Sequence, residues 1–190
     1  QSPRASLKEL KNICRTYPDL ASTSLRVDLA TAFGCPFAGK VTTTAVLRMV
    51  EKVAAMGVRE ITLCDTVGFG HPKDVEEKFL ECNRLFPEIR FGAHFHNTRG
   101  LAQANALRAY DVGVRSFDSA AGGLGGCPFA PGSSGNVATE DLAYLFESMG
   151  IKTGTDLKKL LTVSKWLQQI LPQAKLSGSL FQAGLPSKRK

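Results

Sequence analysis

The spacing of apolar residues along the chain predicts several amphipathic helices. Between residues 42 and 56, Val46 and Val50 fall on one side of such a helix. Thr42 or Thr43 is suited to cap its first turn, because a threonine hydroxyl accepts hydrogen bonds from the free amide groups there. By the same criteria we predict helices over residues 6–17, 42–56, 72–86, 100–112, 139–149 and 155–171.

Between these helices lie shorter apolar segments whose length and partial alternation are typical of strands. We predict strands over residues 25–33, 60–64, 89–96 and 115–120. Strand and helix follow each other with a repeat of about 30 residues, the length of one βα unit. The order therefore predicts an α/β fold with a parallel sheet.

Polar residues follow the carboxyl ends of the predicted strands, where parallel α/β folds place their active sites. Asp65 and His96 end two strands, and a glycine-rich loop follows Ala120. A doubly wound sheet and a (β/α)₈ barrel both fit this pattern. A whole barrel needs at least about 200 residues, whereas this chain has 190 residues and four predicted strands. If the chain belongs to a barrel, it forms the second half.

The domain organisation follows from the same pattern. Residues 1–175 are predicted as the barrel part of one domain, and residues 176–190, with their Gly, Ser and Pro, as a loose C-terminal tail. The chain begins with Gln1 inside a helix-like pattern, so we expect it to be a piece of a longer protein.

Charge and cysteine content narrow the range of functions. The net charge is +7, but the basic residues form no dense stripe with interleaved aromatics, which argues against a nucleic-acid partner. General positive charge instead favours an anionic substrate. No apolar run could span a membrane. The five cysteines include no C-x-x-C pair, which indicates free thiols in a reducing compartment.

Two segments carry residues suited to chemistry. His94 and His96 occupy alternate positions of a predicted strand, so both side chains point to one face, where two imidazoles can hold a divalent metal. They could equally be ordinary sheet residues. Cys127 lies in a glycine-dense loop, where a thiol can act as acid, base or nucleophile, and Asn136 follows shortly after. Asp65, taken alone, is better explained as a residue that caps a helix or binds backbone.

Two glycine motifs are weak evidence for nucleotide binding. Residues 34–40 have the spacing of a phosphate loop, but Val41 stands where Ser or Thr should hold magnesium. The run Gly123-Leu124-Gly125 lacks the third glycine of a dinucleotide fingerprint.

Together the motifs resemble the 3-hydroxy-3-methylglutaryl-CoA lyase family of (β/α)₈-barrel carbon–carbon lyases. The resemblance covers residues 25–161, nearly the whole chain. Its most specific part is the run Gly-Gly-Leu-Gly-Gly-Cys-Pro-Phe-Ala at residues 122–130, the signature loop of the family. Residues 32–37 and 64–68 also match the family, whereas the His-x-His strand is shared with isopropylmalate synthases and ketoacid aldolases.

The resemblance implies roles for individual residues. His94, His96 and Asn136 would be metal ligands, Cys127 would be catalytic, and Asp65 would support the site as a second catalytic residue. The family usually has Asp where this chain has Asn97, which is a mild change.

One departure from the family is larger. The Arg-Asp-Gly motif that ends the first strand of the family barrel occurs nowhere in this sequence. In the family its aspartate binds the metal and its arginine stabilises the developing charge of the substrate.

For the whole protein, the resemblance implies cleavage of 3-hydroxy-3-methylglutaryl-CoA to acetyl-CoA and acetoacetate with Mg²⁺ or Mn²⁺. An acyl-CoA would be the substrate, a homodimer the full-length assembly, and the cytoplasm, or the mitochondrial matrix in a eukaryote, the compartment. Nucleic acid and membrane are not expected partners. The alternatives are another acyl-CoA or ketoacid lyase, aldolase or synthase of the superfamily, and an inactive truncated interaction module.

Overall fold

The computed structural model describes residues 2–126 and 135–186. Its strands are β1 (Arg26–Leu29), β2 (Glu60–Asp65), β3 (Arg90–Phe95) and β4 (Ser116–Asp118). Its helices are α1 (Pro3–Thr16), α2 (Pro18–Thr23), α3 (Thr43–Ala54), α4 (Pro72–Leu85), α5 (Ala102–Asp111), α6 (Thr139–Ser148), α7 (Leu157–Ile170) and α8 (Ser179–Ala183), with a short 3₁₀ turn, η1 (Ala121–Gly123). The helices and strands predicted above all form, most of them with small shifts at their ends.

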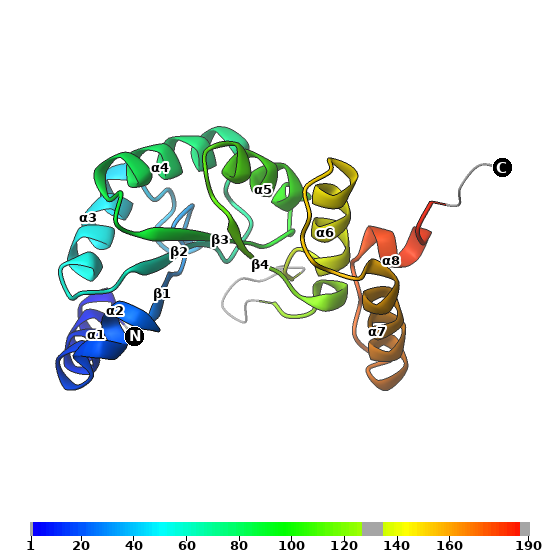
Figure 1. The fold of residues 1–190 in the computed structure, drawn as a ribbon, viewed down its shortest axis with the longest axis horizontal. Coiled ribbons are helices and arrows are strands. Elements are labelled where there is room, and N and C mark those ends of the chain that lie inside the picture. Colours follow the sequence, from blue (N-terminus) through cyan, green and yellow to red (C-terminus); the bar gives the residue numbers. More distant parts are fainter. Residues whose placement is uncertain (1, 127–134, 187–190) are drawn as a thin grey trace.

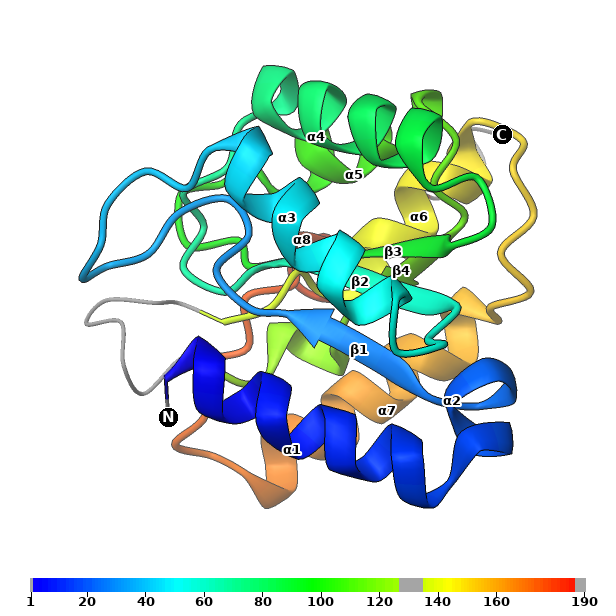
Figure 2. The same ribbon diagram turned by 90° about the vertical axis from the view of Figure 1, so that its left-hand side faces the viewer.

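The four strands make one parallel sheet in the order β1-β2-β3-β4. Helices α3, α4 and α5 lie along one face of this sheet, which arches beneath them (Figure 1). Seen from the β1 side, α1 lies beside β1 on the opposite side from α3 (Figure 2). A sequential strand order with the connecting helices on one face is the arrangement of a (β/α)₈ barrel, whereas a doubly wound sheet reverses its order.

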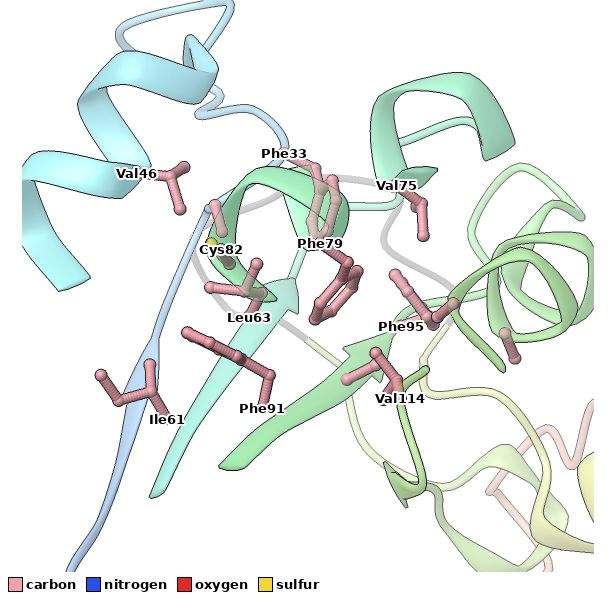
Figure 3. Packing of buried hydrophobic residues seen from close by; sticks show 14 of the residues in the cluster. Phe33, Val46, Ile61, Leu63, Val75, Phe79, Cys82, Phe91, Phe95 and Val114 are labelled. Atoms are coloured by element: carbon pink, nitrogen blue, oxygen red, sulfur yellow. The ribbon is translucent and has the colours of Figure 1, made fainter. Parts of the chain in front are cut away.

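The hydrophobic core fills the space between the sheet and these helices. Phe91 and Phe95 of β3 point toward α4, where Val75 and Phe79 meet them (Figure 3). Phe33, in the loop after β1, packs on this cluster, with its ring 5.7 Å from that of Phe95. Apart from Asp65 at the end of β2, the strands therefore turn polar side chains to the concave face and apolar side chains to the helices.

The first strand is shorter than the predicted 25–33. β1 ends at Leu29, and Thr31 takes a positive φ of 58°. The chain then turns, and the Ala32 amide donates to the Cys64 carbonyl at 2.9 Å. Ala32 and Phe33 thus enter the core from a turn and not from a strand.

The segment predicted as a loose tail is folded through residue 186. Leu176 and Leu180 are buried, and α8 packs on α6. The Asp141 carboxylate accepts hydrogen bonds from the amides of Ser179 and Leu180, at 2.8 and 2.7 Å, which fixes the start of α8. Two buried leucines four residues apart and a carboxylate from another helix therefore help to hold this short segment.

Among the helices of the described residues, none combines the length and apolar character needed to cross a bilayer.

We expect the core thiol of Cys82 to resist alkylation. Cys82 has no exposed surface, and burial raises the pKa of its thiol to about 12. At pH 8 almost none of it is thiolate, the form that attacks iodoacetamide. Peptide mass spectrometry after treatment of the folded chain should show Cys35, which is half-buried, modified before Cys82. Equal rates for the two thiols would contradict the described packing.

Candidate active site

Two histidines lie together at the carboxyl end of β3. Strand alternation turns Phe95 into the core and places His94 and His96 on the concave face, where their ring centroids are 5.3 Å apart. The His96 amide donates to the Asp65 carbonyl at 3.1 Å, which extends the pairing of β3 with β2 by one residue. Backbone pairing therefore holds both imidazoles in place.

His96 is neutral at physiological pH. Burial lowers the pKa of its imidazole to about 4, and the neighbouring His94 imidazole acts in the same direction. A neutral imidazole offers a lone pair, which is the form that binds metal ions.

Asn136 lies directly beside His96. The two residues form an antiparallel bridge flanked by hydrogen bonds from the Asn97 amide to the Gly135 carbonyl and from the Val137 amide to the Phe95 carbonyl, at 3.0 and 3.1 Å. Such a pair brings its side chains close on the same face. The structure thus brings Asn136 to the histidines from a separate part of the chain.

The two ends of the Asn136 amide have different surroundings. Its Nδ2 donates to the Leu124 carbonyl at 2.7 Å, which fixes the orientation of the amide. Its Oδ1 is buried and, among the described residues, has no hydrogen-bond donor. A buried amide oxygen without a donor is costly unless something else binds it. Two imidazole nitrogens and one amide oxygen are suitable ligands for a divalent cation, so these residues fit the metal that the sequence implies.

The described residues contain no group of three His, Cys, Asp or Glu side chains placed to hold a metal ion. Within that part of the chain, the donor set on the concave face therefore depends on the amide of Asn136.

Asp65 lies apart from the imidazoles. It pairs in register with Phe95, so its side chain points to the helix-covered face. Its carboxylate accepts hydrogen bonds from the amides of Phe69 and Gly70, at 2.9 and 2.8 Å. Burial raises the pKa of this carboxyl, and the backbone donors partly oppose the shift. Asp65 thus shapes the loop after β2.

Three other features were singled out in the sequence: Cys127, Asn97 and the glycine motif at residues 34–40. Cys127 lies outside the described residues. Asn97 accepts a hydrogen bond from the Ala102 amide at 3.2 Å, a role that either Asn or Asp can fill. In residues 34–40, the amides of Cys35 and Gly39 donate to each other's carbonyls at 2.9 and 2.8 Å, so these amides do not form a phosphate cradle.

An ion-pair network on the concave face was not identified as part of the site from the sequence. Arg26 of β1 binds both carboxylate oxygens of Asp118 on β4, at 2.9 and 3.0 Å, and Asp28 at 3.0 Å. The first and fourth strands of a flat sheet would lie about 14 Å apart, so this contact requires strong curvature. Asp118 Oδ2 also lies 3.5 Å from His94 Nδ1. The one sign of this network in the sequence is that Arg26 and Asp28 occupy alternate positions of a predicted strand, which places both side chains on one face.

The sequential parallel strands with helices on one face define the chain as part of a (β/α)₈ barrel. The model of the HMGL-like family matches residues 4–167, and the chain belongs to this family. Hydroxymethylglutaryl-CoA lyase YngG of Bacillus subtilis is 45% identical over 149 residues, covering 78% of this chain and 50% of that protein. An (R)-citramalyl-CoA lyase of Chloroflexus aurantiacus is 44% identical over 145 residues, covering 76% of this chain and 46% of that protein.

Solved structures agree with this assignment. An HMG-CoA lyase from Acinetobacter baumannii, in complex with coenzyme A and 3-methylmalate, matches with a TM-score of 0.90 and 40% identity, over 100% of this chain and 61% of that one. The predicted barrel fold and the family resemblance are confirmed. The chain spans about half the length of the curated relatives it matches.

Proposed function

We propose that this chain supplies the metal-binding half of a carbon–carbon lyase that cleaves 3-hydroxy-3-methylglutaryl-CoA to acetyl-CoA and acetoacetate. The observation that carries the proposal is the grouping of His94, His96 and Asn136, with the Asn136 Oδ1 left without a donor among the described residues. Family membership and the hydroxymethylglutaryl-CoA lyases among the relatives support the substrate class.

His94, His96 and Asn136 would hold the cation, and Mg²⁺ or Mn²⁺ is our choice. All three donors are neutral, whereas hard cations prefer anionic oxygen. Asp118 is engaged by Arg26, so an anionic ligand must come from the half of the barrel that this chain does not span. When bound, the metal would supply Lewis acidity that makes the substrate hydroxyl more acidic.

The remaining steps are carried by protein groups. A base removes the hydroxyl proton, the carbon–carbon bond breaks, and its electron pair passes to the carbon that becomes the methyl group of acetyl-CoA. We assign the proton that this carbon receives to the thiol of Cys127. Asp65 acts indirectly, by fixing residues 69 and 70 of the loop beside the site.

A second substrate follows from the citramalyl-CoA lyase among the relatives. (R)-citramalyl-CoA is one methylene shorter than 3-hydroxy-3-methylglutaryl-CoA, and its cleavage releases pyruvate in place of acetoacetate. One methylene is worth only about 1–3 kcal/mol of discrimination, so the two activities need a direct comparison.

The test is to complete the barrel. The half of the Bacillus subtilis relative that this chain does not match would be fused ahead of residues 1–190, giving what we call the barrel chimera. With Mg²⁺ or Mn²⁺ it should release acetoacetate from 3-hydroxy-3-methylglutaryl-CoA faster than pyruvate from (R)-citramalyl-CoA. His94→Ala should abolish turnover. A folded barrel chimera that cleaves neither thioester would overturn the lyase proposal and favour an interaction module. Faster release of pyruvate would assign the other substrate.

Asp118 should tune metal binding through His94. A carboxylate facing Nδ1 holds the ring proton there and leaves Nε2 free to bind. Asp118→Asn in residues 1–190 should weaken Co²⁺ binding about tenfold. Asp28→Asn is the matched control, because Asp28 also binds Arg26, whereas Asp118 is the carboxylate that faces His94 Nδ1. A visible-absorbance titration measures the Co²⁺ affinity of both variants. Equal affinities would contradict the role of Asp118 in metal binding.

We also propose that the whole protein is a homodimer that works on an acyl-CoA in the cytoplasm or the mitochondrial matrix. The presence of bacterial and mitochondrial relatives supports both compartments.

A further inference from the structure

The C-terminal segment reaches the base of the glycine-rich loop. Gly122 is buried in η1 with a φ of 64°, and its carbonyl accepts a hydrogen bond from the Ser177 amide at 2.9 Å. Leu176 packs directly on it, because a Cβ at Gly122 would lie 2.8 Å from Leu176 Cδ2. The segment after α7 therefore contacts the loop that carries the family signature (Figure 1).

A buried carboxylate holds Gly122 from the other side. Glu140, at the start of α6, has no exposed surface, and both of its carboxylate oxygens accept from the Gly122 amide, at 3.1 and 3.0 Å. The hydroxyl of Ser164 in α7 donates to the same carboxylate at 3.0 Å. Gly178 leaves room for it, since a Cβ there would lie 2.6 Å from Glu140 Oε1. Both backbone groups of Gly122 are thus fixed by elements outside the sheet.

The next residues carry this constraint to Asn136. Gly123 lies between the Ser177 side chain and the Asn136 backbone, because a Cβ at Gly123 would be 2.2 Å from Ser177 Oγ and 3.0 Å from the Asn136 carbonyl oxygen. The carbonyl of Leu124 then accepts from Asn136 Nδ2 at 2.7 Å. This contact determines which way the amide faces and therefore where Oδ1 points.

We propose that Leu176 and Ser177 are positioning residues for Asn136, acting through Gly122–Leu124 to aim its Oδ1 at the cation. We call Leu176 and Ser177 the clamp. The inference rests on the proposed function, because Asn136 is a ligand only in that proposal. It assigns a role in metal binding to a segment that contacts Gly122 and Gly123 and contributes no proposed ligand of its own. Asp141, which binds the amides of Ser179 and Leu180, anchors the residues that follow the clamp on α6.

The first test removes one hydrogen-bond donor. Ser177→Pro deletes the N–H that binds the Gly122 carbonyl, whereas the matched control Ser177→Ala keeps it. In residues 1–190 labelled with ¹⁵N, the side-chain amide protons of Asn136 should exchange with solvent faster in Ser177→Pro than in Ser177→Ala. The Co²⁺ dissociation constant should rise about tenfold in the proline variant alone.

A second pair of variants covers the case in which Ser177→Pro fails to fold. Leu176 and Leu180 are similarly buried, at 8% and 7% exposed, but of the two only Leu176 appears among the nearest atoms to a Cβ at Gly122. Leu176→Ala should change the Asn136 amide signal and Co²⁺ binding, whereas Leu180→Ala should lower thermal stability without changing either. The Leu180 variant therefore controls for a purely structural effect.

The outcomes separate the inference from the proposed function. If the Asn136 amide signal is the same for the two variants of each pair, the positioning role of the clamp is refuted, whether or not Co²⁺ binding changes. The unsubstituted chain could fail to bind Co²⁺ while its Asn136 amide signal still responds to Ser177→Pro. That result would refute the proposed metal ligands and support the clamp as the part of the chain that orients the amide. If Ser177→Pro changes both the Asn136 amide signal and Co²⁺ binding, and if His96→Ala abolishes only Co²⁺ binding, the results support both the clamp and the metal ligand set.

Discussion

Residues 1–190 alone should cleave 3-hydroxy-3-methylglutaryl-CoA at least about a hundredfold more slowly than the barrel chimera. The first reason is the ligand set. His94, His96 and Asn136 are all neutral donors, and no Arg-Asp-Gly motif is present to add an aspartate. A hard cation such as Mg²⁺ binds weakly without anionic oxygen, so less of the chain would hold metal at a given concentration.

The second reason is the charge that develops when the carbon–carbon bond breaks. The arginine of the missing motif would stabilise that charge, and one such preorganised group is worth about 3 kcal/mol, a factor of roughly a hundred in rate. The chain has its own arginine on the concave face, but Arg26 is bound to Asp118 and Asp28. It is therefore not free to take over this role.

The third reason is the open sheet. β1 and β4 are the outer strands of the described sheet. Unpaired edges bind other chains and admit water. The assay would compare the isolated chain, the barrel chimera and the isolated chain with the other half added in trans, at equal metal concentration. Equal turnover by the isolated chain and the barrel chimera would show that the donor set is complete as it stands.

Features that depend on residues close together in the sequence could be predicted, whereas features that depend on residues far apart could not. The placement of His94 and His96 follows from strand alternation within three residues, which is why the pair is on one face as expected. The contact between Arg26 and Asp118 joins residues 92 positions apart and depends on the curvature of the whole sheet. No local pattern encodes that curvature.

Two other expectations depended on the path of the chain outside the strands. Alternation within β2 places the Asp65 side chain on the helix-covered face, but the hydrogen bonds from Phe69 and Gly70 depend on the path of the following loop. The tail looked loose because its composition is typical of a loop. Its order comes from Asp141 and from the packing of Leu176 on Gly122, more than 50 residues earlier.

Cys127→Ala in the barrel chimera should reduce turnover by about a hundredfold to ten-thousandfold, the usual contribution of a general acid. Cys127 directly follows Gly126, and the described residues on either side of the loop meet at the site, since Leu124 binds the Asn136 amide. Alanine cannot donate a proton to the carbon that becomes the methyl group of acetyl-CoA, so the enolate would have to wait for water. This thiol is not among the proposed metal donors, and truncating a side chain in a loop usually leaves the core intact. Co²⁺ affinity and the unfolding temperature should therefore stay at their parent values.

Cys64→Ala is the matched control for this variant. Cys64 lies in β2 beside His94 in register, but burial raises the pKa of its thiol to about 12, so it is poorly suited to give up a proton near neutral pH. Its replacement should leave the chemical step nearly intact. A further check is exchange of solvent deuterium into the methyl group of acetyl-CoA, which the Cys127 variant should slow in proportion to turnover. Turnover by Cys127→Ala that matches the parent would exclude the thiol as the acid and leave a water molecule or another side chain in that role.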